Sequence, residues 1–232
     1  MHISDLTLTD TRNISLKDIF LSNDNRLALE QVLKEFHYKS RLEEYGLPVQ
    51  HKILLYGPSG CGKTMTASAI ANGLGKKLYI LHLSNLVSSR IGETGQHLKS
   101  VFDKANREQA VLFLDEFDHI GKARGADDKD VGEMRRLVNS LIQLIDQCSA
   151  LLIAATNHVE ILDPALIRRF QARMGFEMPT KEQLDHYYDQ IVFRFPKGVQ
   201  LIERAYGISY AEAQDLAFRQ IKSKLISQWE LD

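Results

Sequence analysis

The sequence GPSGCGKT, at residues 57–64, is the most informative part of this chain. It fits the pattern G-x-x-x-x-G-K-[ST], with the apolar run ILLY at 53–56 before it and TMTASAIANGL at 64–74 after it. A strand, a glycine-rich turn and a helix in this order surround an anion with backbone N–H groups and a helix N-terminus. We therefore predict a nucleotide site here, and the alternative is an ordinary glycine-rich turn.

Each position of this loop has an expected role. Lys63 is expected to reach the β- and γ-phosphates of ATP and to act in catalysis, and Thr64 is expected to ligate Mg²⁺. Cys61 is interpreted as a passive loop residue, with a redox-sensitive thiol beside the phosphates as the alternative. The predicted nucleotide-binding residues of the loop are Gly57, Pro58, Ser59, Gly60, Cys61, Gly62, Lys63, Thr64 and Met65.

The stretch VLFLDEFD, at 111–118, places carboxylates directly after four apolar residues. Ligands of parallel sheets bind at the C-terminal ends of the strands. Asp115 is therefore a candidate Mg²⁺ ligand, and Glu116 is a candidate base for the attacking water. A hydrolase needs both roles, whereas a kinase or a nucleotide-dependent switch functions without the second carboxylate. Asp118 fits a turn or cap residue as well as a site residue.

Two further stretches end in polar residues that suit the same site. LLIAATN, at 151–157, predicts a buried strand, and in one common topology it lies between the phosphate-loop strand and the acidic strand. Asn157 would then face the γ-phosphate and the water, with an ordinary turn residue as the alternative. In LDPALIRRF, at 162–170, Asp163 and Pro164 predict a helix start. Arg168 and Arg169 follow, either as a solvated pair or as groups that reach the γ-phosphate in a neighbouring subunit.

The alternation of short apolar runs with helical stretches is typical of an α/β fold, a parallel sheet covered by helices on both sides. The predicted strands are Ile53–Tyr56, Leu78–Leu83, Val111–Leu114, Leu151–Ala155 and, less distinctly, Met174–Met178. The predicted helices before residue 180 are 24–45, Lys63–Gly73, Gln96–Asn106 and Asp130–Gln147. After residue 180 only helices are predicted, at Lys181–Phe193, Val199–Tyr206 and Tyr210–Gln228. We therefore predict an α/β domain over 1–179, with an N-terminal lead helix, and a small all-α domain over 180–232.

The composition excludes several classes of protein. With 232 residues, 44% of them apolar and 25% charged, the chain is globular rather than disordered. Its formal charge of −1 makes nucleic acid or an anionic membrane an unexpected partner. No apolar run approaches the ~20 residues that cross a bilayer, and the first ten residues do not resemble a secretory signal. Two cysteines cannot form a disulfide framework, so a cytoplasmic protein is expected.

These pieces, in this order, resemble the AAA clade of the AAA+ ATPases. GPSGCGKT matches Walker A, VLFLDEFD Walker B, AATN the sensor-1 segment and LDPALIRRF the arginine-finger segment. The resemblance implies a five-stranded parallel sheet with a helical lid, ATP bound with Mg²⁺, and a ring, most often a hexamer. It also places Ile19 and Phe20 near the adenine. ISYAEAQDL, at 208–216, is a less complete match to the lid signature, because Tyr210 stands where the family has glycine.

One departure from the family concerns the pore of the ring. The family's pore loop carries an aromatic residue in a pattern like S-K-Y-[IV]-G-E, but this chain reads SSRIGE at 88–93, with Arg90 at the aromatic position. An arginine favours acidic or phosphate-bearing partners, or pairs with a neighbouring subunit, rather than gripping a threaded peptide. The polar stretch GKARGADDKDVGE, at 121–133, would be the second pore-side loop.

The function predicted from these features is Mg²⁺-dependent ATP hydrolysis by a ring that remodels a protein substrate or partner. The alternative is a regulatory or scaffold ATPase that switches a separately encoded partner enzyme without threading. Residues 133–170 also resemble small bacterial AAA ATPases that are paired with a subtilisin-like peptidase, so a separate protease is a candidate partner. A nucleic-acid motor and a small-molecule kinase are disfavoured, by the neutral charge and by the Asn157 and arginine segments respectively.

Overall fold

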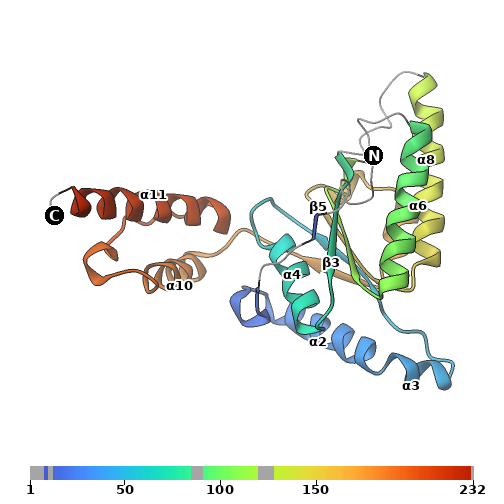
Figure 1. The fold of residues 1–232 in the computed structure, drawn as a ribbon, viewed down its shortest axis with the longest axis horizontal. Coiled ribbons are helices and arrows are strands. Elements are labelled where there is room, and N and C mark those ends of the chain that lie inside the picture. Colours follow the sequence, from blue (N-terminus) through green and yellow to red (C-terminus); the bar gives the residue numbers. More distant parts are fainter. Residues whose placement is uncertain (1–7, 10–12, 85–90, 120–127, 231–232) are drawn as a thin grey trace. The chain divides into compact units, whose positions relative to one another are not determined.

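The computed structural model describes residues 8–9, 13–84, 91–119 and 128–230 (Figure 1). They divide into two units. The first contains the chain up to Gly57 together with Lys63–Gly175, and the second contains Pro58–Gly62 and the chain from Phe176 onward. The chain therefore passes between the units four residues before Pro179, the junction expected from sequence. Five residues of the phosphate loop group with the C-terminal helices, which no sequence pattern indicated.

The first unit is built on a sheet with the strand order β1-β3-β4-β5-β2-β6. Five of these strands are parallel, which confirms the prediction, and β1 pairs antiparallel with β3 at the edge. The two-residue β1 was not predicted, because so short a strand leaves no periodicity to recognise. The strands are β1 (Leu8–Thr9), β2 (Lys52–Tyr56), β3 (Leu78–His82), β4 (Val111–Asp115), β5 (Leu151–Thr156) and β6 (Ala172–Gly175).

Strand β6 begins two residues before the predicted Met174–Met178. In it Ala172 and Met174 are buried while Arg173 is exposed, so its pattern alternates as expected for the end strand of a sheet. The central strands are buried on both faces, which explains why they appear in the sequence as uninterrupted apolar runs. The edge position of β6 therefore made its limits harder to predict.

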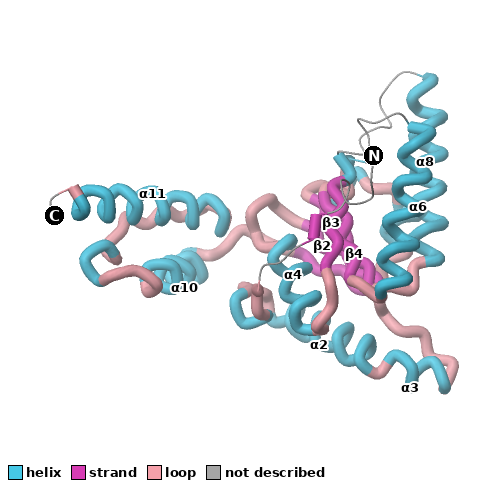
Figure 2. Tube along the Cα trace, viewed as in Figure 1, coloured by secondary structure: helices cyan, strands magenta, loops and turns pink. Residues whose placement is uncertain are grey.

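Helices cover both faces of the sheet, as predicted. In Figures 1 and 2, α2 and α4 lie on one side, and α6 and α8 lie on the other. The predicted helix over 24–45 is divided into α2 and α3 by a turn at Tyr38, whose ψ of 16° is not helical. The helical segments of this unit include η1 (Leu16–Asp18), α2 (Asn23–His37), α3 (Lys39–Glu44), α4 (Lys63–Gly73), α6 (Ile91–Glu108), α8 (Asp128–Gln147), η3 (Val159–Ile161) and α9 (Pro164–Ile167).

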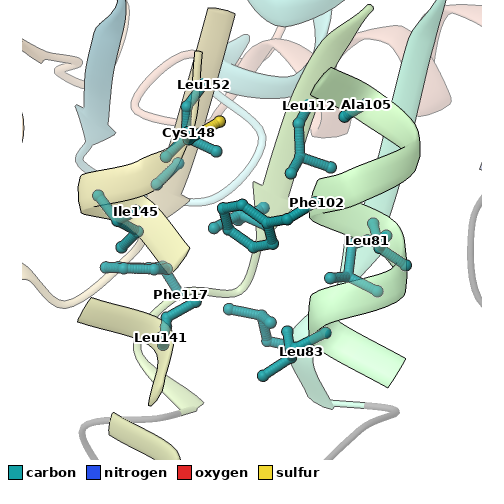
Figure 3. Packing of buried hydrophobic residues seen from close by; sticks show 14 of the residues in the cluster. Leu81, Leu83, Phe102, Ala105, Leu112, Phe117, Leu141, Ile145, Cys148 and Leu152 are labelled. Atoms are coloured by element: carbon teal, nitrogen blue, oxygen red, sulfur yellow. The ribbon is translucent and has the colours of Figure 1, made fainter. Parts of the chain in front are cut away.

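The larger hydrophobic core lies between the sheet and helices α6 and α8 (Figure 3). Phe102 from α6, Leu141 from α8 and Leu112 of β4 belong to this cluster, and all three are almost completely buried. Burial of one such side chain stabilises the fold by about 1.5–3 kcal/mol. Phe117, just after β4, belongs to the same cluster and stacks edge-on against Phe170 at 5.6 Å. The carboxyl end of β4 is therefore anchored in the core beside the carboxylates that follow it.

The second unit has its own small core, formed by α10 (Lys181–Val192), η4 (Lys197–Val199) and α11 (Tyr210–Trp229). Both α-helices begin with a capping box, from Thr180 in α10 and from Ser209 in α11. The fully buried side chains of Tyr188, Ala213 and Ala217 all belong to this core.

The predicted helix Val199–Tyr206 is wrong, because most of this segment is an irregular connection. Side chains from the two helices take the place of helical hydrogen bonds. The Glu203 N–H donates to Gln220 Oε1, Gln220 Nε2 donates to the Glu203 carbonyl, and the Tyr188 hydroxyl donates to the Ala205 carbonyl. Such partners, supplied from distant positions, cannot be recognised in the local sequence.

Candidate ATP-binding site

The strand order β4-β5-β2 brings two predicted site residues and the phosphate loop to one edge of the sheet. Asp115 ends β4, Asn157 directly follows β5, and the phosphate loop follows β2. Because these strands are parallel, their carboxyl ends meet where ligands of α/β proteins bind. The adjacency of β5 to β2, on which the interpretation of Asn157 depended, is present in the sheet.

Lys63 connects the phosphate loop to Asn157. It is the first residue of α4 and is buried, and its Nζ donates to the Gly57 carbonyl at 2.6 Å and to Asn157 Oδ1 at 2.8 Å. A buried ammonium group needs such polar partners. Thr64 and Met65 follow in the first turn of the same helix and are half-buried. The structure therefore brings the predicted phosphate-binding lysine and the predicted sensor residue together.

Asp115, the predicted Mg²⁺ ligand, is a partly buried carboxylate at the end of β4. Its side chain is 21% exposed; Oδ1 accepts the Glu116 N–H at 2.9 Å, and Oδ2 lies 3.7 Å from His82 Nδ1. Burial raises the pKa of Asp115 above its ordinary value, and this outweighs the lowering effects of the Glu116 N–H and of His82. A bound cation would favour the ionised carboxylate.

The donors present fit Mg²⁺, which prefers oxygen ligands and is usually held by one or two protein groups together with phosphates and water. The carboxylate of Asp115 and the hydroxyl of Thr64 are such donors. In the described part of the chain no three His, Cys, Asp or Glu side chains gather as a metal site of their own.

Glu116 has an unusual backbone. Its φ of +54° lies in the left-handed region, which a residue other than glycine adopts at a cost. Its side chain is 43% exposed, with Oε2 3.8 Å from His119 Nε2. The left-handed turn therefore leaves a carboxylate accessible to water at the C-terminal end of β4, as a general base requires.

Asp118 is more buried than its sequence suggested. It is only 3% exposed, and its Oδ1 accepts hydrogen bonds from Thr156 Oγ1 and from the Asn157 N–H. The sequence offered one signal, which is that this acid follows the buried Phe117 within an apolar environment. Without the strand order, however, its partners could not be identified.

The central residues of the phosphate loop pack within the second unit. The Gly60 carbonyl accepts the Ala211 N–H at 3.2 Å, and the Cys61 thiol lies 3.8 Å from the sulfur of Met178. Cys61 is 2% exposed. Tyr210, the residue that departs from the lid signature, stacks edge-on against Tyr187 at 5.0 Å, and burial raises its pKa to about 12. The larger residue is thus accommodated within the helical unit.

Gly60→Ala is expected to lower the melting temperature more than Gly207→Ala does. Both glycines have φ of +73°, so any side chain costs about 1–2 kcal/mol at either position. At Gly60 the added Cβ would also lie 2.5 Å from Ser209 Oγ, whereas at Gly207 no described atom lies within 4 Å. Calorimetry of the nucleotide-free variants measures the difference, and equal losses would contradict the packing of this loop.

The two arginines have different environments. Arg169 donates to the carboxylate of Asp146 at 3.2 and 3.4 Å and to the Ala165 carbonyl at 2.7 Å. Arg168 is exposed, and within the described ranges its guanidinium has no hydrogen bond or ion pair. The helix start is as predicted, because Asp163 caps α9 by accepting the Ala165 N–H. Arg168 is therefore free to meet another molecule, while Arg169 is already held.

The remaining sequence predictions are not decided by these contacts. Ile19 is buried and Phe20 is half-buried, between η1 and α2, and their contact with adenine stays a prediction. Arg90 and residues 121–127 lie outside the described residues, so the predictions for the pore loops also stay predictions.

Comparison with known proteins identifies the family to which this site belongs. The model of the "ATPase family associated with various cellular activities (AAA)" matches residues 53–178, which is more than half of the chain. The chain belongs to the AAA family of ATPases. The resemblance to the AAA family inferred from Walker A, Walker B and the segments that follow is thereby confirmed.

Individual relatives agree with this assignment. The AAA family ATPase y4kL of Sinorhizobium fredii is 35% identical over 219 residues, which cover 91% of this chain and 65% of that protein. The proteasome-associated ATPase of Mycobacterium tuberculosis is 30% identical over 220 residues, covering 83% of this chain and 36% of that protein. The AAA chain thus spans less than two thirds of the length of either relative.

A solved structure shows the same fold. The FIGL-1 AAA domain superposes with a TM-score of 0.72 at 21% identity, covering 93% of this AAA chain and 74% of that one. Among the described residues, no helix has both the length and the apolar character that crossing a bilayer requires.

Proposed function

We propose that this AAA ATPase hydrolyses Mg²⁺-bound ATP in a ring of subunits, most often a hexamer, and uses the cycle to remodel a protein substrate or partner. The observation that carries the proposal is the convergence of Lys63, Asn157 and the Asp115–Glu116 pair on one edge of the sheet. A nucleotide-binding module without hydrolysis has no need of the second carboxylate.

In the proposed mechanism the phosphates lie against the loop of residues 57–62 and the N-terminus of α4. In the structure the Lys63 ammonium group donates to Asn157 and to the Gly57 carbonyl. With ATP bound, the same group would donate to the β- and γ-phosphates. Thr64 and Asp115 would hold Mg²⁺, which when bound neutralises charge on the phosphate oxygens. Glu116 would accept a proton from the attacking water, and the Asn157 amide would orient that water.

The site would be completed by a neighbouring subunit. Phosphoryl transfer is accelerated when a guanidinium approaches the γ-phosphate, and the exposed Arg168 is available for that role. Arg169, tied to Asp146, would hold the segment in place. With this division of roles between the two arginines, activity would require a neighbouring subunit.

The proposed partner is a protein, and a separately encoded protease is the candidate. The proteasome-associated ATPase is a relative named for its association with such a machine. Nucleic acid and membrane are not proposed as partners, since the formal charge is only −1. The two free thiols, Cys61 and Cys148, suit a reducing cytoplasm, which is the proposed location.

The proposal predicts that ATP hydrolysis depends on assembly and on magnesium. The rate per protomer should rise steeply with protein concentration and should fall to background when EDTA removes the metal. Phosphate release measured over a dilution series, with the mass of the particle determined in parallel, tests this. A constant rate per protomer, carried by a monomer, would overturn the ring mechanism. ATP binding without hydrolysis at any concentration would favour the regulatory scaffold instead.

A further inference from the structure

The turn after β4 is joined to the end of β5 by backbone and side-chain hydrogen bonds. The Phe117 N–H donates to the Ala155 carbonyl at 2.8 Å. One residue later, Asp118 Oδ1 accepts the Thr156 hydroxyl at 3.2 Å and the Asn157 N–H at 3.4 Å. Asp118 and Thr156 are 3% and 1% exposed, so the bond between their side chains is made away from water. A buried carboxylate that satisfies two donors of one neighbouring strand fixes the turn against that strand.

These hydrogen bonds stabilise a turn whose backbone conformation is unfavourable by itself. Glu116 has a left-handed φ of +54°, and such conformations persist only where surrounding contacts determine them. On its N-terminal side the Glu116 N–H is held by Asp115 Oδ1, and its carbonyl accepts the His119 N–H at 3.0 Å. Asp118 supplies the longer-range bonds that tie this turn to β5.

The same carboxylate also orients the tip of β5. Asn157 receives a bond from Asp118 at its N–H and offers its Oδ1 to Lys63. The other partner of Asp118 is Thr156. Its backbone carbonyl accepts the Gly57 N–H at 3.2 Å, at the start of the phosphate loop. Asp118 therefore links the turn that carries Glu116 to the strand end that carries Asn157.

We propose that Asp118 is a positioning residue for hydrolysis, whose buried carboxylate sets the geometry between Glu116 and Asn157. The inference rests on the proposed hydrolytic mechanism. Water must be placed accurately by both groups, and a misplacement of about 1 Å costs on the order of 10²-fold in rate. Nucleotide binding depends instead on the phosphate loop and α4. Loss of Asp118 should therefore lower kcat and leave the affinity for ATP nearly unchanged.

The test compares Asp118→Ala, Asp118→Asn and Thr156→Val in the full chain. Asp118→Ala is expected to lower kcat by about 10–100-fold with KM and the Kd for Mg-ATP within about 3-fold of wild type. Asp118→Asn keeps an oxygen acceptor for both donors and should recover most of the rate. Thr156→Val removes the donor to Asp118, together with the acceptor of the His158 N–H, at nearly constant volume. Combining it with Asp118→Ala should cost little beyond the loss that the two single variants share.

Controls separate this role from a purely structural one. Thr94→Val, at a buried threonine of α6, is expected to keep the wild-type kcat. Folding is checked by circular dichroism and by the melting temperature. If a folded Asp118→Ala keeps its kcat, or loses ATP affinity and kcat together, the proposal is overturned. If Asp118→Ala does not fold, Thr156→Val decides: it removes one of the two donors and should lower kcat, and a wild-type kcat in that variant overturns the proposal. Absence of hydrolysis in the wild-type chain would instead refute the proposed function.

Discussion

Glu116→Gln is expected to lower kcat for ATP hydrolysis by about 10²–10⁴-fold while ATP still binds. The amide keeps the size and hydrogen-bonding reach of the carboxylate but cannot accept a proton from water. Its effect on folding should be small, because glutamine occupies the same left-handed position at a similar cost and the side chain is 43% exposed. Single-turnover hydrolysis and equilibrium binding of a fluorescent ATP analogue measure the two quantities separately.

The same substitution at a surface glutamate serves as a control for Glu116→Gln. Glu43, on the surface of α3, has a side chain that is 57% exposed, so Glu43→Gln makes the same chemical change away from the site. It should leave the rate unchanged. Wild-type kcat in Glu116→Gln would rule out Glu116 as the base, and a parallel loss of nucleotide binding would mean that the variant disturbs the site as a whole.

Arg168→Ala is expected to lower kcat by about 10³–10⁵-fold if the guanidinium acts on the γ-phosphate of a neighbour. Arg168 makes no side-chain hydrogen bond or ion pair with the residues that the structure describes, so its removal should not destabilise the subunit. Mixing provides the decisive measurement. Arg168→Ala subunits keep Glu116, and Glu116→Gln subunits keep Arg168, so a mixture should regain activity at interfaces that combine the two intact groups.

Recovery on mixing would be hard to explain for an active site contained in one chain. If the mixture is no more active than its two components, Arg168 does not act across an interface. The Asp146→Asn variant tests the assignment of the second arginine, because it weakens the bidentate partner of Arg169 without removing either guanidinium. A smaller loss than in Arg168→Ala is expected there, and a larger loss would reverse the roles of the two arginines.

Much of the site could be predicted because its residues adjoin strong local signals. The helix predicted over Lys63–Gly73 has those limits in the structure, since the glycine-rich loop marks its start. Asp115 and Asn157 each end a buried strand, and strand ends are visible in sequence as apolar runs followed by polar residues.

What could not be predicted depends on contacts between distant parts of the chain. Asp118 has its partners 38 and 39 residues away, so its burial follows only from the order of the strands. The connection after Val199 is held by side chains of both neighbouring helices instead of by its own periodicity. The different environments of Arg168 and Arg169 arise from Asp146, on another helix, which the adjacent pair in the sequence does not reveal.

The pairing of β2 has a consequence for how the protein is made. Lys52 in this strand pairs with Leu152, and Ile53 pairs with Ala172, so both neighbours of the strand are synthesised about a hundred residues later. During synthesis the apolar run ILLY therefore leaves the ribosome before β5 and β6 exist to pair with it. Unpaired apolar strands are prone to aggregate. Because the predicted nucleotide site follows a central strand, we expect β2 to need protection from aggregation until the chain is nearly complete.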